Sequence, residues 1–512
     1  MSLFPLLAML ALAARALGVG DRTLTETSST PSVTVHFTTT AGPNQTTRAI
    51  ADAVAREMDG ALHFLFRRYR PAIPASNNGK LNVDIKDLGS ANGRTDAMAI
   101  VGDARLAASY INITSDLVAR AAASGLTLEE FIRVVCMHEC MHAVQNSYNA
   151  HVSPWFREAQ AAWAEAAFTG ISGQLAGYYA AGDSVSLNPG LPLWAATPGE
   201  AHERSLSAFV HFLVSKKGMR IVDRWLAATE GTNDAMAALQ TALGGDGRTF
   251  SGLYRQFLLQ LYRRDIRFTP IAGGRANLVL PPIAELPALS ELGQDFDLTL
   301  TPTGAAFARF TPDVRIPNTY AIAMVEDGAT GAPELLVIKR PQRTSPIRTI
   351  KPADHTVING FNSSVETLVI FTDTTVRDET VPPTPIKAKL LSPYLHFKTV
   401  QPETPIAAGQ ISTIDITYDL LGLPPGVTSM RVDFRIAGRG PGVAVRTTQE
   451  IDAFTGADRH LFPIFQSAAD RAGSYRFTWT GLTPMRGFSA RKLPQSRTSI
   501  SNHVVVDEAP AP

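Results

Sequence analysis

The spacing of apolar residues over the first half of the chain predicts a mixture of strands and helices. Residues 33–37 alternate between apolar and polar side chains, as a strand with one buried face does. Between about residues 47 and 69, apolar side chains recur every three or four positions, which is the period of one helix face. Further strands are expected over residues 81–85 and 108–113, and further helices over residues 205–229 and 250–262.

Two helices in the middle of this region have recognisable beginnings. Thr127 followed by Glu130 is a capping box, which predicts a helix over residues 127–148. Pro154 suits the first turn of a second helix, which is expected over residues 153–168. The stretch between them is long enough for one turn, so the chain should return along the first helix.

Beyond about residue 266, prolines become frequent, the helical period fades and short strands recur between turn residues. The expected fold class is therefore α+β. We expect a domain with a small sheet and a helical subdomain over residues 33–265. A β-sandwich domain over 266–385 and an Ig-like β-sandwich domain over 386–508 should follow it.

Charge and hydropathy narrow the expected partners and location. The chain has 47 basic and 46 acidic side chains, a formal net charge of +1, which gives no reason to expect nucleic acid as a partner. The apolar stretch over residues 3–14 is too short to span a bilayer, and residues 1–20 are typical of a signal peptide. No later segment is apolar enough to span a membrane, so we expect a secreted protein.

Two histidines on the first of these helices predict a metal site. His138 and His142 are four residues apart, so their imidazoles lie about 40° apart around the helix axis, one turn above the other. Both can reach one zinc ion. Glu139 lies about 100° from His138, where it can act as a base on a water held by the metal.

A catalytic zinc needs a third protein ligand, and the second helix offers two carboxylates. Glu158 and Glu165 are seven residues apart and share a helix face, but they are too distant from each other to bind one ion together. His151, in the turn, is a competing ligand, and a plain surface role for Glu165 stays open.

The chain has two cysteines, Cys136 and Cys140, which rules out a disulfide framework. On the helical wheel both fall on the side opposite His138. We expect them to pack in the core as small apolar residues, without a disulfide between them.

The residues of the two helices carry a resemblance to a known family. His138-Glu139-Cys140-Met141-His142, followed by Trp155-Phe156-Arg157-Glu158-Ala159 and Trp163-Ala164-Glu165, is similar to the gluzincin group of secreted zinc metallopeptidases. The resemblance implies a zincin-like fold over residues 33–265 and Zn²⁺ as cofactor. It further implies Glu158 as the third ligand, Glu139 as the general base and Glu165 as a supporting residue beyond the ligands.

One departure from the family concerns the group that would hold the oxyanion. Members often carry a Tyr-Gly pair near the position of residues 205–209, and this chain lacks it. His202 and Tyr148 are the candidates that the sequence offers instead.

The expected function is that of a zinc metalloendopeptidase. It would hydrolyse peptide bonds of a protein or peptide substrate through a zinc-activated water, with Glu139 as general base. One alternative is a catalytically inactive scaffold whose C-terminal β-domains bind glycan, cell wall or protein. A second alternative keeps the zinc chemistry but hydrolyses a non-peptide amide.

Overall fold

The computed structural model contains two compact units, one formed by residues Met1–Ala284 with Val376–Pro383 and the other by Glu285–Thr375 with Thr384–Pro512. The structure describes residues 23–75, 79–100, 103–245, 247–268, 276–289, 295–310, 319–325, 333–339, 348–349, 355–361, 367–374, 379, 386–391, 394–402, 411–421, 429–438, 444–452, 460–465, 474–486 and 502–505. The signal peptide expected at residues 1–20 lies outside them. The chain mixes helices and sheets, as the sequence predicts.

The first unit contains a five-stranded sheet in the order β1-β2-β3-β5-β4. Its strands are β1 (Glu26–Ser29), β2 (Val33–Phe37), β3 (Leu81–Lys86), β4 (Gly93–Ile100) and β5 (Asp103–Thr114). The three central strands run parallel, and the edge strands β1 and β4 are antiparallel to their neighbours. The strands expected at 33–37, 81–85 and 108–113 are these central three. Neither edge strand was expected.

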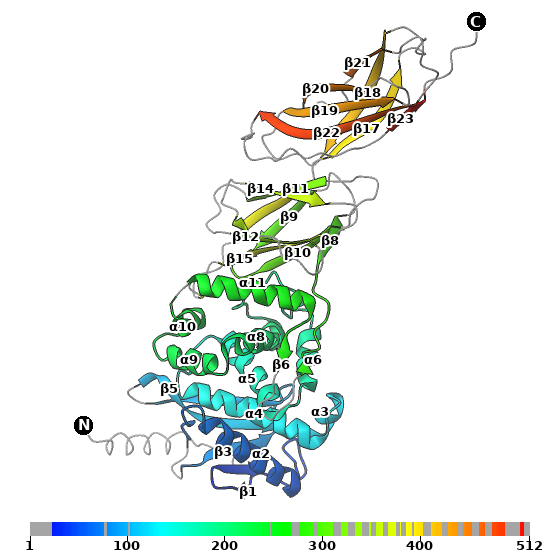
Figure 1. Ribbon diagram of the computed structural model, residues 1–512. Coiled ribbons are helices and arrows are strands. Elements are labelled where there is room, and N and C mark those ends of the chain that lie inside the picture. The colour runs from blue at the N-terminus through cyan, green and yellow to red at the C-terminus, as the bar shows by residue number, and fades with distance from the viewer. Residues whose placement is uncertain are drawn as a thin grey trace. The chain divides into compact units, whose positions relative to one another are not determined.

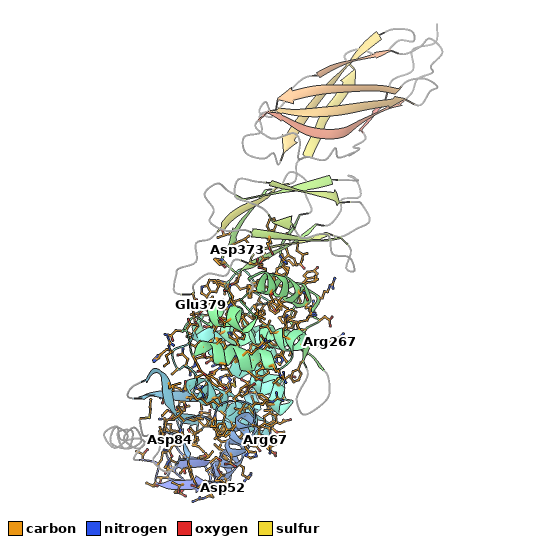
Figure 2. All side chains as sticks on the ribbon, turned by 60° about the vertical axis from the view of Figure 1, so that its left-hand side comes forward. Asp52, Arg67, Asp84, Arg267, Asp373 and Glu379 are labelled. Atoms are coloured by element: carbon orange, nitrogen blue, oxygen red, sulfur yellow. The ribbon has the colours of Figure 1, made fainter. Side chains whose placement is uncertain are left out.

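Helices α2 (Arg48–Phe66) and α4 (Leu128–Asn146) contact each other and the sheet (Figure 1). Asp52 on α2 accepts a hydrogen bond from Ser28 Oγ of β1 at 2.6 Å, which fastens this helix to the edge strand; Asp52 is labelled in Figure 2. The cysteines lie on the α4 face that packs on α2. Cys136 Sγ is 3.9 Å from Val54 O. Both cysteines are buried and free, which confirms the expectation from the sequence.

The other helices of this unit are α3 (Leu117–Ala123), α5 (Pro154–Thr169), α6 (Gly173–Ala180), the 3₁₀ turn η1 (Pro198–Glu200), α7 (Ala201–Ser205), α8 (Ser207–Lys217), α9 (Arg220–Thr229), α10 (Ala235–Ala242) and α11 (Gly247–Arg263). The helical section expected over residues 205–229 consists of two helices, because the chain breaks at Gly218. That residue has φ 73° and ψ 172°, an extended conformation at positive φ that favours glycine and ends α8 before α9 begins. No helix within the described residues is long and apolar enough to cross a membrane.

Residue Glu379 returns from the far part of the sequence to the first unit. Its carboxylate accepts hydrogen bonds from Ser153 Oγ and from the backbone N–H of Met236, the latter at 2.7 Å. Ser153 precedes α5 and Met236 lies in the first turn of α10, so Glu379 joins the starts of two helices. Figure 2 labels this residue together with Arg267 of the short strand β6 (Arg267–Phe268).

The second unit contributes strands to four sheets among the residues described. Two sheets have the orders β13-β12-β15-β10-β8 and β14-β11-β16-β9, and two have the orders β17-β18-β21 and β20-β19-β22-β23. The strands are β8 (Leu286–Leu289), β9 (Asp295–Leu300), β10 (Ala305–Phe310), β11 (Thr319–Val325), β12 (Pro333–Lys339), β13 (Arg348–Thr349), β14 (His355–Phe361), β15 (Thr367–Asp373), β16 (Ile386–Leu391), β17 (Tyr394–Pro402), β18 (Ile411–Leu421), β19 (Ser429–Gly438), β20 (Ala444–Asp452), β21 (His460–Phe465), β22 (Ser474–Arg486) and β23 (Asn502–Val505). The first β-domain was expected to end at residue 385. Strand β16 lies beyond that residue but pairs with β9 and β11, so the sheet that contains these two strands extends past the expected boundary.

Candidate metal centre

Helices α4 and α5 together position a cluster of two histidines and one glutamate. Helix α4 begins with the expected capping box, in which Thr127 Oγ1 accepts from the backbone N–H of Glu130 at 3.2 Å and the Glu130 carboxylate accepts from the N–H of Thr127 at 3.0 Å. Helix α5 has Pro154 in its first turn. The two helices contact each other, as the short connection predicts.

The three side chains converge on one point between these helices. His138 Nε2 and His142 Nε2 are 3.1 Å apart. Glu158 Oε1 lies 3.1 Å from His142 Nε2, and Glu158 Oε2 lies 3.4 Å from His138 Nε2. In tetrahedral zinc sites with bonds of about 2.0–2.1 Å, neighbouring ligand atoms are about 3.3 Å apart. The cluster therefore has the size of a metal site, although this donor set is not specific for zinc.

The outer nitrogen of each imidazole has a buried partner. His138 Nδ1 is 2.7 Å from Glu165 Oε1, and His142 Nδ1 is 2.8 Å from Gln145 Oε1. An ionised carboxylate and an amide oxygen can only accept, so both Nδ1 atoms carry a hydrogen and both Nε2 atoms face the cluster. These contacts fix the ring orientation that metal binding requires.

Burial and neighbouring charges shift the pKa values of His138 and Glu158 in opposite directions. Burial lowers the pKa of His138, but hydrogen bonds and Coulombic attraction from Glu158 and Glu165 outweigh it and raise the pKa to about 10. Burial raises the pKa of Glu158, but attraction to His142 and His138 holds it well below its usual range. Without a metal, His138 therefore stays protonated beside an ionised Glu158, and a metal must displace that proton.

Arg204 of α7 also contacts the cluster. Its Nε donates to Glu158 Oε2 at 3.1 Å, and its Nη2 donates to Glu200 Oε2 at 2.6 Å. The guanidinium thus orients the carboxylate oxygen nearer His138 and supports its negative charge.

Glu139 lies on the α4 face next to strand β4. Its Oε2 accepts a hydrogen bond from Thr95 Oγ1 at 2.6 Å, and its backbone carbonyl accepts from the same hydroxyl at 3.1 Å. Gly93 gives the carboxylate its room, because a Cβ at that position would be 2.5 Å from Glu139 Oε1. The edge strand therefore sets where this carboxylate points.

Two cavities adjoin the cluster and share His138, Glu139 and Arg204 as lining residues. The larger, of about 330 Å³, extends on the side of His142 and the start of α5. The smaller, of about 70 Å³, extends on the side of Glu165 and α6, where it is lined by Tyr178. The cluster is thus accessible from two directions.

The remaining residues singled out by the sequence lie elsewhere. His202 is buried with its Nε2 2.9 Å from Pro192 O. The Tyr148 hydroxyl accepts from the backbone N–H of Arg70 at 2.9 Å. Neither lines the two cavities. His151 is exposed in the turn and is absent from the metal-sized cluster.

Sequence reasoning missed several residues that contact the site, namely Gly93, Thr95, Gln145, Tyr178 and Arg204. Gln145 is the exception that a local signal could have found. It follows His142 by three positions on one helix, close enough for side-chain contact. The others come from segments distant in the sequence.

Comparisons with models of known protein families and with curated protein sequences find no match to this chain. Among solved structures, similarity extends to a glycosyl hydrolase family 2 member from Bacteroides cellulosilyticus, with 13% identity and a TM-score of 0.17 over 40% of this chain and 28% of that one. The β-glucuronidase of Bacteroides uniformis has 10% identity and a TM-score of 0.17 over 40% of this chain and 26% of its own. The chain spans less than a third of either protein, and similarity this low supports no assignment.

Proposed function

We propose that this protein is a zinc metalloendopeptidase of the gluzincin type, with His138, His142 and Glu158 as metal ligands. The observation that supports this most is the cluster itself. The two imidazole Nε2 atoms are 3.1 Å apart, each lies 3.1–3.4 Å from one oxygen of Glu158, and Glu139 follows the first histidine directly in the sequence. The buried partners of both imidazoles support the same reading.

The residues around the cluster supply the other requirements of hydrolysis. When bound, zinc would lower the pKa of a coordinated water and polarise a carbonyl oxygen. Glu139 would accept the proton of the attacking water and pass it to the leaving amine. Thr95 would hold the Glu139 carboxylate in place, because its hydroxyl donates to Oε2.

Tyr178 and Arg204 are better placed than His202 or Tyr148 to donate to a developing oxyanion, because both line the smaller cavity beside His138. Burial, together with the charge of Glu165, raises the pKa of Tyr178 well above its usual range. The hydroxyl therefore keeps its proton at neutral pH and can act as a donor.

The proposal includes the rest of the chain. The strands of the second unit would form two β-sandwich domains that bind a glycan or another surface ligand, and residues 1–20 would direct secretion. The alternating strands beyond residue 285 support the first part. The apolar stretch at residues 3–14 supports the second.

The test compares three glutamate variants on one helix pair. Glu139→Gln should retain stoichiometric zinc, measured by plasma mass spectrometry, and lose hydrolysis of a quenched fluorescent peptide library. Glu158→Ala should lose both zinc and hydrolysis, because only two ligands remain. Glu129→Gln is the matched control. Its side chain lies on the same helix and is 73% exposed, so zinc and hydrolysis should both persist.

Two outcomes would contradict the proposal. If the Glu139→Gln variant hydrolysed peptides at the parental rate, Glu139 would not be the general base. Stoichiometric zinc without hydrolysis of any peptide would instead favour the inactive scaffold.

A further inference from the structure

Three arginines line the larger cavity, and they differ in their ionic partners. Arg94 pairs with Asp96, with Nε 3.0 Å from Oδ1, and is mostly exposed. Arg204 pairs with two glutamates at 3.1 Å and 2.6 Å. Arg157 forms no ion pair with any residue that the structure describes. It is therefore the cation of this cavity whose charge lacks a contacting counter-ion.

The contacts of Arg157 are few and neutral. Its Nη2 donates to Asn146 Oδ1 at 3.1 Å, and its Nη1 donates to Ala150 O at the long distance of 3.5 Å. Its Nε is buried and has no hydrogen-bond partner among the described atoms. A guanidinium has five N–H donors, so most of its capacity stays unused. Retaining a partly buried charge with so few partners is costly unless a ligand completes them.

No carboxylate among the described residues contacts Arg157. Glu158 directs its oxygens at the two histidines and Arg204, and Glu139 is held by Thr95. Both of them, and Glu200 of the same cavity, act on Arg157 only through longer-range attraction. Arg157 also lies near the start of α5, and Pro154 of its first turn lines the cavity, so the partial positive charge of the helix end adds to the guanidinium.

We propose that Arg157 binds a carboxylate of the substrate in the larger cavity, on the His142 side of the metal position. This rests on the proposed peptidase function and names the substrate class: peptides with a carboxylate near the bond that is cut. An acidic side chain or a free C-terminus supplies the same group. Either would accept paired hydrogen bonds from the unused donors.

The experiment uses two series of quenched fluorescent peptides with the zinc-loaded protein. In the first, a glutamate is moved through the positions flanking the cut bond, each peptide has a glutamine twin, and all C-termini are amidated. In the second, a neutral peptide is compared as free acid and as amide. The readout is the ratio of kcat/KM for carboxylate over amide. We expect this ratio to be about ten to a hundred in one of the two series, and that series identifies the source of the carboxylate.

Variants assign the ratio to one residue. Arg157→Gln should bring it to about one. Arg157→Lys keeps the charge but loses the planar fork, so its ratio should be intermediate, and it decides the matter if the glutamine variant does not fold. Arg94→Gln is the matched control from the same cavity. Because Arg94 is already paired with Asp96, its removal should leave the ratio unchanged within about two-fold.

A parallel binding measurement separates this inference from the proposed function. Calorimetric titration of the same peptide pairs into zinc-loaded Glu139→Gln protein, with and without Arg157→Gln, reports recognition without turnover. If the wild type hydrolyses no peptide but binding shows the ratio and its loss, the peptidase proposal fails and the carboxylate site stands. If hydrolysis occurs but the ratio is near one, or survives Arg157→Gln, the carboxylate site is refuted.

Discussion

On the proposed function, replacing Gly93 with alanine should abolish peptide hydrolysis without removing bound zinc. The added Cβ would lie 2.5 Å from Glu139 Oε1 and 2.8 Å from Glu139 Cδ, whereas ordinary contacts begin at 3.4 Å. The strand backbone is fixed by pairing with β5, so the glutamate side chain is the part that moves. It must move by about 1 Å, and displacing a reacting group by that amount costs about a hundred-fold in rate.

The metal ligands should not respond to this change. His138, His142 and Glu158 are held by α4, α5 and their own buried partners, and the three atoms nearest the new methyl group all belong to Glu139. We therefore expect kcat for a fluorogenic peptide to fall by about a hundred-fold at full zinc occupancy. Circular dichroism and zinc content measured on the same sample check that fold and metal persist.

Gly60→Ala is the matched control for this substitution. Gly60 lies on an exposed position of α2, and an added Cβ there meets nothing within 4 Å. Alanine in a helix is favoured by about 1 kcal/mol over glycine, so this variant should be slightly more stable and fully active. The reasoning would be refuted if Gly93→Ala kept kcat within about three-fold, or if it lost zinc together with activity.

The remaining predictions concern the metal and one buried histidine. Glu165→Gln should weaken zinc binding by about ten- to hundred-fold in a competition titration, because Glu165 orients His138; an unchanged affinity would contradict this. Zinc at a thousand times its Kd should raise the free energy of unfolding by about 4 kcal/mol in urea titrations, and Glu158→Ala should show no such increase. Burial lowers the pKa of His211 in the folded protein to about 3, whereas its pKa in the unfolded chain is about 6.5. Between these two values only the unfolded chain takes up the proton, so the free energy of unfolding falls as the pH falls below about 6.5. His211→Leu should therefore gain about 2 kcal/mol relative to the wild type between pH 7 and pH 5, and an equal difference at both pH values would refute the assignment.

The two helices that carry the metal cluster could be predicted because their signals are local. The capping box at Thr127 and the proline at position 154 mark where each helix begins. Helix α4 starts one residue after Thr127, and helix α5 starts at Pro154. The spacing of His138 and His142 then places both rings on one face. Such signals need no knowledge of the tertiary structure.

Strand β4 was missed because its sequence is weak for a strand. Residues 93–100 begin with glycine, contain the run Ala-Met-Ala at residues 97–99, and have few β-branched side chains. Its strand conformation comes from pairing with β5 at the edge of the sheet. The contact of Thr95 with Glu139 therefore depends on tertiary structure and leaves no trace in either segment alone.

The break between α8 and α9 did have a signal. Lys216 and Lys217 followed by Gly218 form the usual end of a helix, with basic residues in the last turn and glycine after it. The spacing of apolar residues alone gives the helical section over residues 205–229 without this break. The contact of Arg204 with Glu158, by contrast, depends on how α7 packs on α5.

Because both cysteines are buried between α2 and α4, their reaction with a thiol reagent would measure how often these two helices separate. Burial raises the pKa of both thiols well above the usual range, so a reagent that attacks thiolates finds none on the folded molecule. Labelling of Cys136 or Cys140 can proceed only when α4 separates from α2. Because α4 also carries both histidines, the labelling rate with and without zinc would read out how far metal occupancy suppresses that separation.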